Sequence, residues 1–370
     1  MLKKLKCFLT GSESICNKDN IKNLGEVPLS SEGINKVDSF NYSPPNDHNQ
    51  IIGNPDTLGI IKTKRTWGCE LECGSSSFRN KVIGRMLIGA NHNWGSDNSV
   101  SYNHSSEIKT CPLVGIDGET ELREVCELIK NTKQQVNASC GTHCHIGVPE
   151  ARVKNTPDSV EKKLKNLLFM YLVIDDAVVS MLPDDRRGNS YCQSFSSSMP
   201  ALFNRGKKKQ SETLRKQKRF DMVWFSSTKE VAEERKLRNS TPHGRYGINF
   251  GSLYKHGTLE IRYHEGTLDA ERLIHWIAFH SAIVDMVMDG DINDKQINEL
   301  AKFKETEKLL QAIIDMLGSK ISTETISAIK KRYTGYKKLN KKLDKEILNR
   351  SDDDREDDAE DDDDDDNYWN

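Results

Sequence analysis

Apolar residues recur at helical spacing in five stretches of the chain. Over residues 119–135, Leu122, Val125, Cys126 and Ile129 fall on one face of a helix with about 3.6 residues per turn. The same spacing predicts helices over residues 160–182, 267–288, 291–317 and 323–348. The last two are rich in charged residues, which indicates surface helices packed on the rest of the protein.

Four shorter segments alternate between apolar and polar residues, which is the pattern of strands with one buried face. They cover residues 66–73, 139–148, 245–250 and 258–264. The last two are close enough in the chain to form a hairpin, with its turn near residues 255–257. Strands with apolar reverse faces beside amphipathic helices predict an α+β fold in which helices cover one face of a sheet.

The first two predicted strands place ionisable side chains side by side. Glu70 and Glu72 share one face, and adjacent carboxylates repel each other unless a cation lies between them. Hard divalent cations prefer such oxygen ligands, although two solvent-facing glutamates would give the same pattern. His143 and His145 share a face of the second strand. Such a pair is typical of metal or phosphate sites, whereas a single histidine is more often hydrogen-bonded in a core.

The predicted hairpin adds further polar side chains. Arg245 and Asn249 share one face of its first strand. Glu260, Arg262 and His264 share one face of its second strand, where an ordinary salt bridge would explain Glu260 and Arg262 by themselves. The repetition of such faces over four strands favours a binding surface. The sequence has no P-loop, dinucleotide-binding glycine pattern or His-Glu-x-x-His motif, so a nucleotide would be held through metal ions and arginines.

Composition restricts the class of protein. The 370-residue chain is 35% hydrophobic and has no apolar run of the roughly 20 residues that a membrane helix needs. Its nine cysteines are scattered, and the N-terminus lacks the long apolar stretch of a secretory signal. These features predict a cytoplasmic protein with free thiols and no membrane partner.

The charge of the chain is unevenly distributed. The formal net charge is -2, but residues 351–370 hold thirteen acidic residues and one arginine, which leaves about +10 on residues 1–350. A dense run of like charges cannot bury apolar surface, so this tail is expected to be disordered. We divide the rest into a flexible polar leader (1–62), a catalytic domain (63–292) and C-terminal helices packed on it (293–350). The basic body suits an anionic ligand such as a nucleotide.

Residues 205–219 form a basic segment with eight Lys or Arg and one Glu. A solvated insertion explains this segment better than a nucleic-acid-binding patch does, because no aromatic residue interleaves with the charges to stack on bases.

Five short motifs occur in order along residues 65–288. They are residues 68–72 (GCELE), 140–148 (CGTHCHIGV), 185–192 (DRRGNSYC), 245–249 (RYGIN) and 258–267 (TLEIRYHEGT). In this order they resemble the amidoligase family, which is grouped with glutamine synthetase and the γ-glutamylcysteine ligases among carboxylate–amine ligases. A looser match covers residues 97–100 and then residues 106–113, which carry Glu107, although Asn98, Thr110 and Cys111 depart from the family's pattern.

The resemblance implies a curved antiparallel sheet that forms a partial barrel, with helices packed on its outer face, as in the catalytic domain of glutamine synthetase. It implies Mg²⁺ or Mn²⁺ ligands at Glu70, Glu72, Glu107, His145 and Glu260. It implies ATP contacts from His143, His145, Asn249 and Arg262. The transferred phosphoryl group or the acid substrate would meet Arg186, Arg187, Arg245 and Arg262. The implied reaction uses ATP to join a small-molecule or peptide carboxylate to an amine through an acyl phosphate, forming an amide or isopeptide bond.

The sequence is also compatible with other functions. A metal-dependent hydrolase would employ His143, His145, Glu70 and Glu72 without ATP, and a guanido kinase would transfer a phosphoryl group to a guanidino nitrogen. A nucleic-acid-binding protein would rely on residues 205–219, and nucleic acid is not the expected partner. A scaffold without activity is a further alternative. The identities of the acid and the amine, and the oligomeric state, do not follow from the sequence.

Overall fold

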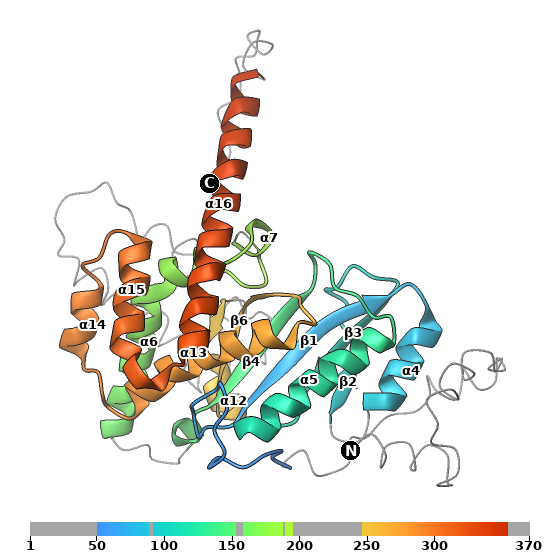
Figure 1. The fold of residues 1–370 in the computed structure, drawn as a ribbon, viewed down its shortest axis with the longest axis horizontal. Helices are drawn as coiled ribbons and strands as arrows, with labels where there is room; N and C mark the ends of the chain where they lie inside the picture. Colours follow the sequence, from blue (N-terminus) through green and yellow to red (C-terminus); the bar gives the residue numbers. More distant parts are fainter. Residues whose placement is uncertain (1–49, 89–91, 153–157, 188, 195–245, 354–370) are drawn as a thin grey trace, which may run out of the picture.

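The computed structural model describes residues 50–88, 92–152, 158–187, 189–194 and 246–353 (Figure 1). The strands are β1 (Trp67–Ser75), β2 (Asn93–Gly95), β3 (His104–Lys109), β4 (Gly141–Gly147), β5 (Ile248–Asn249) and β6 (Thr258–Glu265). They pair antiparallel into one sheet in the order β2-β3-β1-β4-β6-β5, and this sheet is open, not closed into a barrel.

Helices make up most of the remaining described chain. They are α4 (Phe78–Ile88), α5 (Gly115–Asn131), α6 (Asp158–Val179), α7 (Asp184–Arg187), α12 (Gly251–His256), α13 (Ala270–Met288), α14 (Asp294–Leu300), α15 (Thr306–Leu317) and α16 (Thr323–Asp353), with short 3₁₀ helices at Pro149–Arg152 and Gly318–Lys320. The mixture of helices with an antiparallel sheet confirms the predicted α+β class. The likeness to the catalytic domain of glutamine synthetase stays a prediction.

The apolar face of the sheet packs against helices. Cys69, Leu71 and Cys73 of β1 are buried on this side. Figure 1 shows α5 and α13 along one face of the sheet, and α13 contacts β4, α5, α6 and α16. Buried residues occupy every side of α13, as expected for a helix enclosed by its neighbours. The seven cysteines of the described residues are buried and unpaired, as free thiols.

The register of the strands decides which polar side chains meet. On β1, Glu70 lies opposite Lys109 of β3 and opposite His143 of β4. Glu72 lies opposite Glu107 in the same pairing of β1 with β3. Directly opposed residues project their side chains to the same face, so the polar faces of the central strands combine into one surface.

Two predicted elements differ from the structure. The predicted hairpin contains a short helix, α12, which ends at Gly257 in a left-handed conformation (φ +71°) before β6 begins. The predicted helix 291–317 is two helices, because Asn293 caps α14 and Glu305 adopts extended backbone before α15. No glycine or proline marks this break in the sequence between residues 300 and 306.

The described part of the expected leader, residues 50–62, packs on the domain. The Ile52 N–H donates to the carbonyl of Pro112 at 2.9 Å, and the Ile61 N–H donates to Oε1 of Glu119 at 2.8 Å. The folded part therefore extends to the N-terminal side of residue 63. The remainder of the leader, the basic segment 205–219 and the tail beyond residue 353 lie outside the described residues. Among the helices that the structure describes, none is both long and apolar enough to cross a membrane.

His264 departs from its expected place beside Glu260 and Arg262. The register of β4 and β6 shifts by one residue between Thr142 and Cys144, and this shift turns His264 to the apolar face of the sheet. Its ring is fully buried, with Nε2 3.1 Å from Nη1 of Arg332 and its centroid 5.3 Å from that of Trp276. A neutral imidazole accepts a hydrogen bond from the guanidinium and packs on the aromatic ring, which holds His264 in the interior.

A second buried histidine, His280, lies near the first. Its Nδ1 is 3.1 Å from the hydroxyl of Tyr171, and its ring centroid is 4.5 Å from that of Trp276. Burial lowers the pKa of both His264 and His280 to about 3, so both rings stay neutral near pH 7.

Acid is therefore expected to destabilise the protein through these histidines. In the unfolded chain a histidine takes up a proton near pH 6.5, whereas in the folded protein His280 does so only near pH 3. The unfolded state binds more protons in this window, so the free energy of unfolding falls as the pH falls. We expect the urea midpoint to decrease less between pH 6.5 and pH 4.5 in His280→Gln than in the wild type.

Comparing the wild type with His280→Gln isolates the contribution of His280 to the pH dependence of stability. Burial also raises the pKa of Glu72 to about 7, so the folded state binds more protons than the unfolded state at this carboxyl, and the free energy of unfolding rises as the pH falls. This contribution is the same in the wild type and in His280→Gln. Identical pH dependence of the two urea midpoints would show that His280 does not carry this effect.

Candidate functional site

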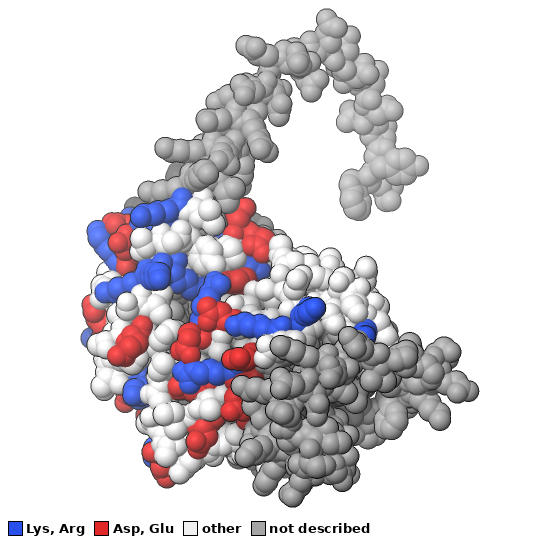
Figure 2. All heavy atoms as spheres, turned by 45° about the vertical axis from the view of Figure 1, so that its right-hand side comes forward, with Lys and Arg blue, Asp and Glu red and all other residues white. Residues whose placement is uncertain are grey.

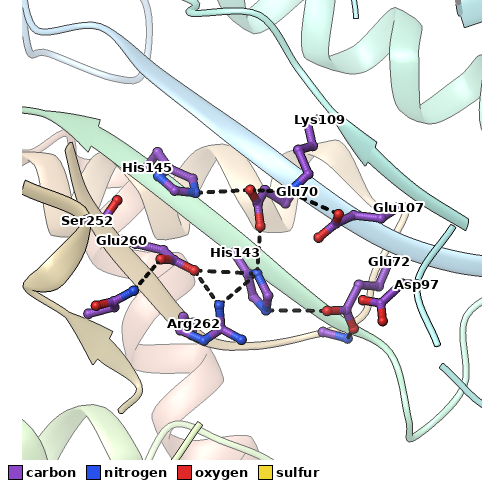
Figure 3. Close-up of polar contacts among 12 residues, drawn as sticks. Glu70, Glu72, Asp97, Glu107, Lys109, His143, His145, Ser252, Glu260 and Arg262 are labelled. Atoms are coloured by element: carbon purple, nitrogen blue, oxygen red, sulfur yellow. Dashed lines mark hydrogen bonds and ion pairs between the residues drawn. The ribbon is translucent and has the colours of Figure 1, made fainter. Parts of the chain in front are cut away.

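A pocket of about 350 Å³ opens on the polar face of the sheet. Its lining residues are Glu70, Glu72, Asp97, Ser99, Glu107, Lys109, Ser139, His143, Arg186, Asn189, Tyr191 and Arg262. They come from four strands, helix α7 and the adjoining loops. Figure 3 shows the polar groups of Glu70, Glu107 and His143 directed toward one another. Since the lining is almost entirely polar or charged, the pocket suits a polar ligand.

Glu70 is at the centre of the contacts. Its Oε1 is 2.8 Å from Nζ of Lys109 and 3.5 Å from Nε2 of His145, and its Oε2 is 3.0 Å from Nδ1 of His143. Burial would raise the pKa of the Glu70 carboxyl, but hydrogen bonds with the two imidazoles outweigh this and hold the pKa below its usual range. Burial, together with the charge of Arg262, lowers the pKa of His143. A neutral imidazole and an ionised carboxylate are the forms that bind metal ions.

Three carboxyl groups converge at one end of the pocket, from Glu72, Asp97 and Glu107 (Figure 3). The Gly141 N–H donates to Oε2 of Glu72 at 2.6 Å, and the backbone and hydroxyl of Ser99 both donate to Oδ1 of Asp97 at 2.7 Å. Burial raises the pKa of Glu72 to about 7 and also raises the pKa of Glu107. A cation among these carboxyl groups would favour their ionised forms.

Two arginines border the same pocket. Arg262 pairs with Glu260 through Nη1 and donates from Nε to the carbonyl of Tyr191 at 3.3 Å. Arg186 is buried and donates from Nη2 to the carbonyl of Arg262 at 2.7 Å, while its Nε has no hydrogen-bond partner among the described residues. Gly141 makes room for this guanidinium, since a Cβ there would lie 2.8 Å from Nη2 of Arg186.

Further hydrogen bonds fix the orientation of the central side chains. Asn249 donates from Nδ2 to Oε2 of Glu260 at 2.7 Å. Nδ1 of His145 is 2.9 Å from Oγ1 of Thr258, which is in turn 3.0 Å from Oγ of Ser252. Such outer contacts orient the ligand side chains of metal sites.

The donor groups fit hard divalent cations. Three groups of side chains have ligand atoms within 4.8 Å of one another: Glu70–His145–Glu260, Glu70–Glu107–His143 and Glu72–Asp97–Glu107. Carboxylate oxygens with a minority of imidazole nitrogens suit Mg²⁺ or Mn²⁺. Glu70 and Glu107 each belong to two of the groups, so metal ions bound there would share ligands.

The structure brings most of the predicted site residues together. Those that line or adjoin the pocket are Glu70, Glu72, Glu107, His143, His145, Arg186, Glu260 and Arg262. Asn249 lies behind Glu260 and supports it. Arg187 is outside the lining, with Nη1 3.9 Å from Oδ1 of Asp184. Arg245 lies outside the described residues.

Several pocket residues were not predicted. Lys109 follows Glu107 by two positions on β3, so strand alternation alone could have placed both on one face. Asp97 is in the loop before β3, where no periodicity gives a side chain's direction. Asn189 and Tyr191 fall within the motif at residues 185–192, in which only the arginines were given roles.

Comparison with known proteins adds one match. A family model described as "Putative amidoligase enzyme" matches residues 70–284, which is more than half of the chain. The matched region runs from Glu70 into α13 and includes the lining residues of the pocket. No curated protein matches the chain.

Proposed function

The chain belongs to the amidoligase family, and we propose that it is an ATP-dependent ligase that joins a carboxylate to an amine. The observation that carries this proposal is the pocket in which three metal-ligand groups lie beside two arginines. We also propose that its sheet is related in architecture to the catalytic domain of glutamine synthetase.

The proposed reaction overcomes a poor leaving group. A carboxylate does not acylate an amine near neutral pH, because an oxide ion would have to depart. Transfer of the γ-phosphoryl group of ATP to a carboxylate oxygen would give ADP and an acyl phosphate. The amine nitrogen would then attack the carbonyl carbon, the bond from that carbon to the phosphate oxygen would break, and the nitrogen would lose a proton. This sequence forms an amide or isopeptide bond without a protein nucleophile.

In this proposal the carboxylates bind metal ions and the arginines bind phosphoryl or carboxylate oxygens. Glu70 and Glu107, with the other ligands named above, would hold Mg²⁺ or Mn²⁺, and such ions neutralise charge on the phosphates when bound. Arg262 and Arg186 would direct their N–H groups to phosphoryl or carboxylate oxygens. The unpartnered Nε of Arg186 supports this role, because a buried donor favours a ligand that accepts from it.

The alternative functions have less support. A metal-dependent hydrolase could use the same ligands, but it gives no role to the two arginines beside them. For a nucleic-acid-binding protein a surface of one charge sign is expected. On the face that Figure 2 displays, Lys and Arg of the described residues are interspersed with Asp and Glu. The acid and the amine are small molecules or peptides in this proposal, in keeping with a polar pocket of about 350 Å³.

The test is Mg²⁺-dependent turnover of ATP by the full-length protein. We expect ADP and phosphate to form only when a suitable acid is present in a pool of carboxylates and amines. With hydroxylamine as acceptor, a hydroxamate should accumulate and identify the acid. Omission of the acid and addition of EDTA serve as controls. Absence of ADP formation across the pool, together with no ATP binding by calorimetry, would rule out the ligase.

A further inference from the structure

We propose that Lys109 is a built-in cation of this pocket, with its ammonium group in the middle metal position between Glu70 and Glu107. Divalent ions would then bind on either side of the lysine. This inference rests on the proposed function, because it concerns how many metal ions the same pocket takes.

The register of β1 and β3 puts Lys109 at this position. Lys109 is directly opposite Glu70, and Glu107 is two residues before it on the same face of β3. Nζ of Lys109 is 2.8 Å from Oε1 of Glu70 and 3.0 Å from Oε2 of Glu107. Figure 3 shows the lysine reaching these two carboxylates from β3. With His143 they make up the middle of the three ligand groups, so a metal ion there would compete with the ammonium group for the same oxygens.

The charges of the pocket explain why a lysine is stable there. Glu70 and Glu107 are largely buried, so the attraction between each carboxylate and the ammonium is less screened than at an open surface. A lysine ammonium is a compact charge with three donors, which lets one group bridge two carboxylates. Without it, these two carboxylates would face each other beside His143 with no ammonium group between them.

The two outer groups keep ligands that the lysine does not touch. His145 and Glu260 lie on one side, and Glu72 and Asp97 lie on the other. Each outer group shares one carboxylate, Glu70 or Glu107, with the lysine, whose side chain is 42% exposed. The arrangement therefore predicts two divalent ions per chain, separated by one protein cation.

The experiment is a titration of the full-length protein with Mn²⁺ alone, followed by the electron paramagnetic resonance signal of the free ion. The wild type is compared with Lys109→Met, which keeps most of the length of the side chain and removes its charge. We expect the variant to bind one more Mn²⁺ than the wild type, or to bind its tightest ion about tenfold more tightly, because the competing charge is gone. Lys109→Arg keeps the charge and should match the wild-type stoichiometry.

Matched controls separate this effect from a general change in charge or folding. Lys302→Met removes a lysine from an exposed pair with Glu299 and should leave Mn²⁺ binding unchanged. Circular dichroism establishes folding, and Lys109→Gln replaces Lys109→Met if the latter does not fold.

Each outcome has a distinct meaning. Unchanged stoichiometry and affinity in Lys109→Met would overturn the role of Lys109 while leaving metal binding, and with it the proposed function, intact. Weaker ATP binding with unchanged Mn²⁺ binding would assign the lysine to the nucleotide instead and also overturn the inference. Absence of Mn²⁺ binding by every protein, wild type included, would overturn both the inference and the metal-dependent function.

Discussion

Glu70→Gln is expected to lower kcat/KM of the ligation about a thousandfold, the loss that follows when several kcal/mol of metal-assisted stabilisation disappear. Glu70 belongs to two of the three ligand groups and contacts Lys109, His143 and His145. Glutamine keeps the size of the side chain but replaces an anionic oxygen with an amide, which cannot neutralise a cation. The substitution therefore weakens the metal position that Glu70 shares with His145 and Glu260, and it removes one of the two carboxylates that hold Lys109, without leaving a cavity.

The test measures kcat/KM and the affinity for Mn²⁺ in each glutamate-to-glutamine variant. Glu72 belongs to one ligand group, whereas Glu70 and Glu107 each combine one outer metal position with an ion pair to Lys109. Glu72→Gln should therefore cost less than Glu70→Gln, and Glu107→Gln should cost about as much as Glu70→Gln. Glu299→Gln makes the same chemical change at an exposed position and serves as the control. If Glu70→Gln is folded and turns over like the wild type, the assignment of this pocket as the active site is wrong.

Arg332→Met is expected to destabilise the protein by about 3–5 kcal/mol, the usual cost of removing one partner from a buried ion pair. Arg332 and Glu265 are only 10% and 13% exposed, and two nitrogens of the guanidinium contact this carboxylate. Nε of Arg332 donates to the carbonyl of Met181 at 2.9 Å, and the guanidinium lies 4.9 Å from the ring centroid of Trp276. Methionine fills much of the space but leaves Glu265 with less compensation for its burial.

Urea unfolding measures this loss. Arg332→Lys should have an intermediate effect, because lysine keeps the charge but not the planar pair of donors. Arg123→Met removes a more exposed arginine, which pairs with Glu271 at the surface and lies 3.6 Å from the buried carboxylate of Glu119, and it should cost less than Arg332→Met. Equal unfolding free energies for Arg332→Met and Arg123→Met would contradict the assignment of a buried ion pair.

This pair connects the C-terminal helix to the pocket. Arg332 lies on α16, beyond the region that the family model matches, whereas Glu265 ends β6. Met181 precedes the short helix that carries Arg186 into the pocket. Through Arg332, helix α16 thus contacts both the strand of Arg262 and the segment that leads to Arg186. The proposed reaction with ATP uses no residue of α16.

Local pattern was enough to predict which side chains share a face of β1 and of β4. Glu70 and Glu72, and likewise His143 and His145, lie two residues apart, and alternation along a strand is a property of the backbone itself. The structure places these faces toward one pocket. The α+β class followed from the same reasoning, because strand and helix periods differ.

Pairing between distant segments could not be predicted in this way. The contact of Lys109 with Glu70 depends on the register of β1 and β3, which long-range packing decides. Consecutive residues on a helix point in directions about 100° apart, so only one of Arg186 and Arg187 could face the pocket, and the sequence did not say which. The position of His264 on the apolar face follows from the register shift between β4 and β6, which alternation along β6 does not predict.

The pairing of β4 with β6 has a consequence for how the molecule is made. These neighbouring strands are separated by about 110 residues of chain, so the sheet is completed only after two segments far apart in the chain have come together. A growing chain that has left the ribosome only as far as β4 carries Glu70, Glu107 and His143 but has neither Glu260 nor Arg262. Its β4 edge is unpaired and its apolar face lacks α13. We expect such a nascent chain to depend on chaperones until β6 and α13 emerge, and truncated chains that stop short of them to aggregate.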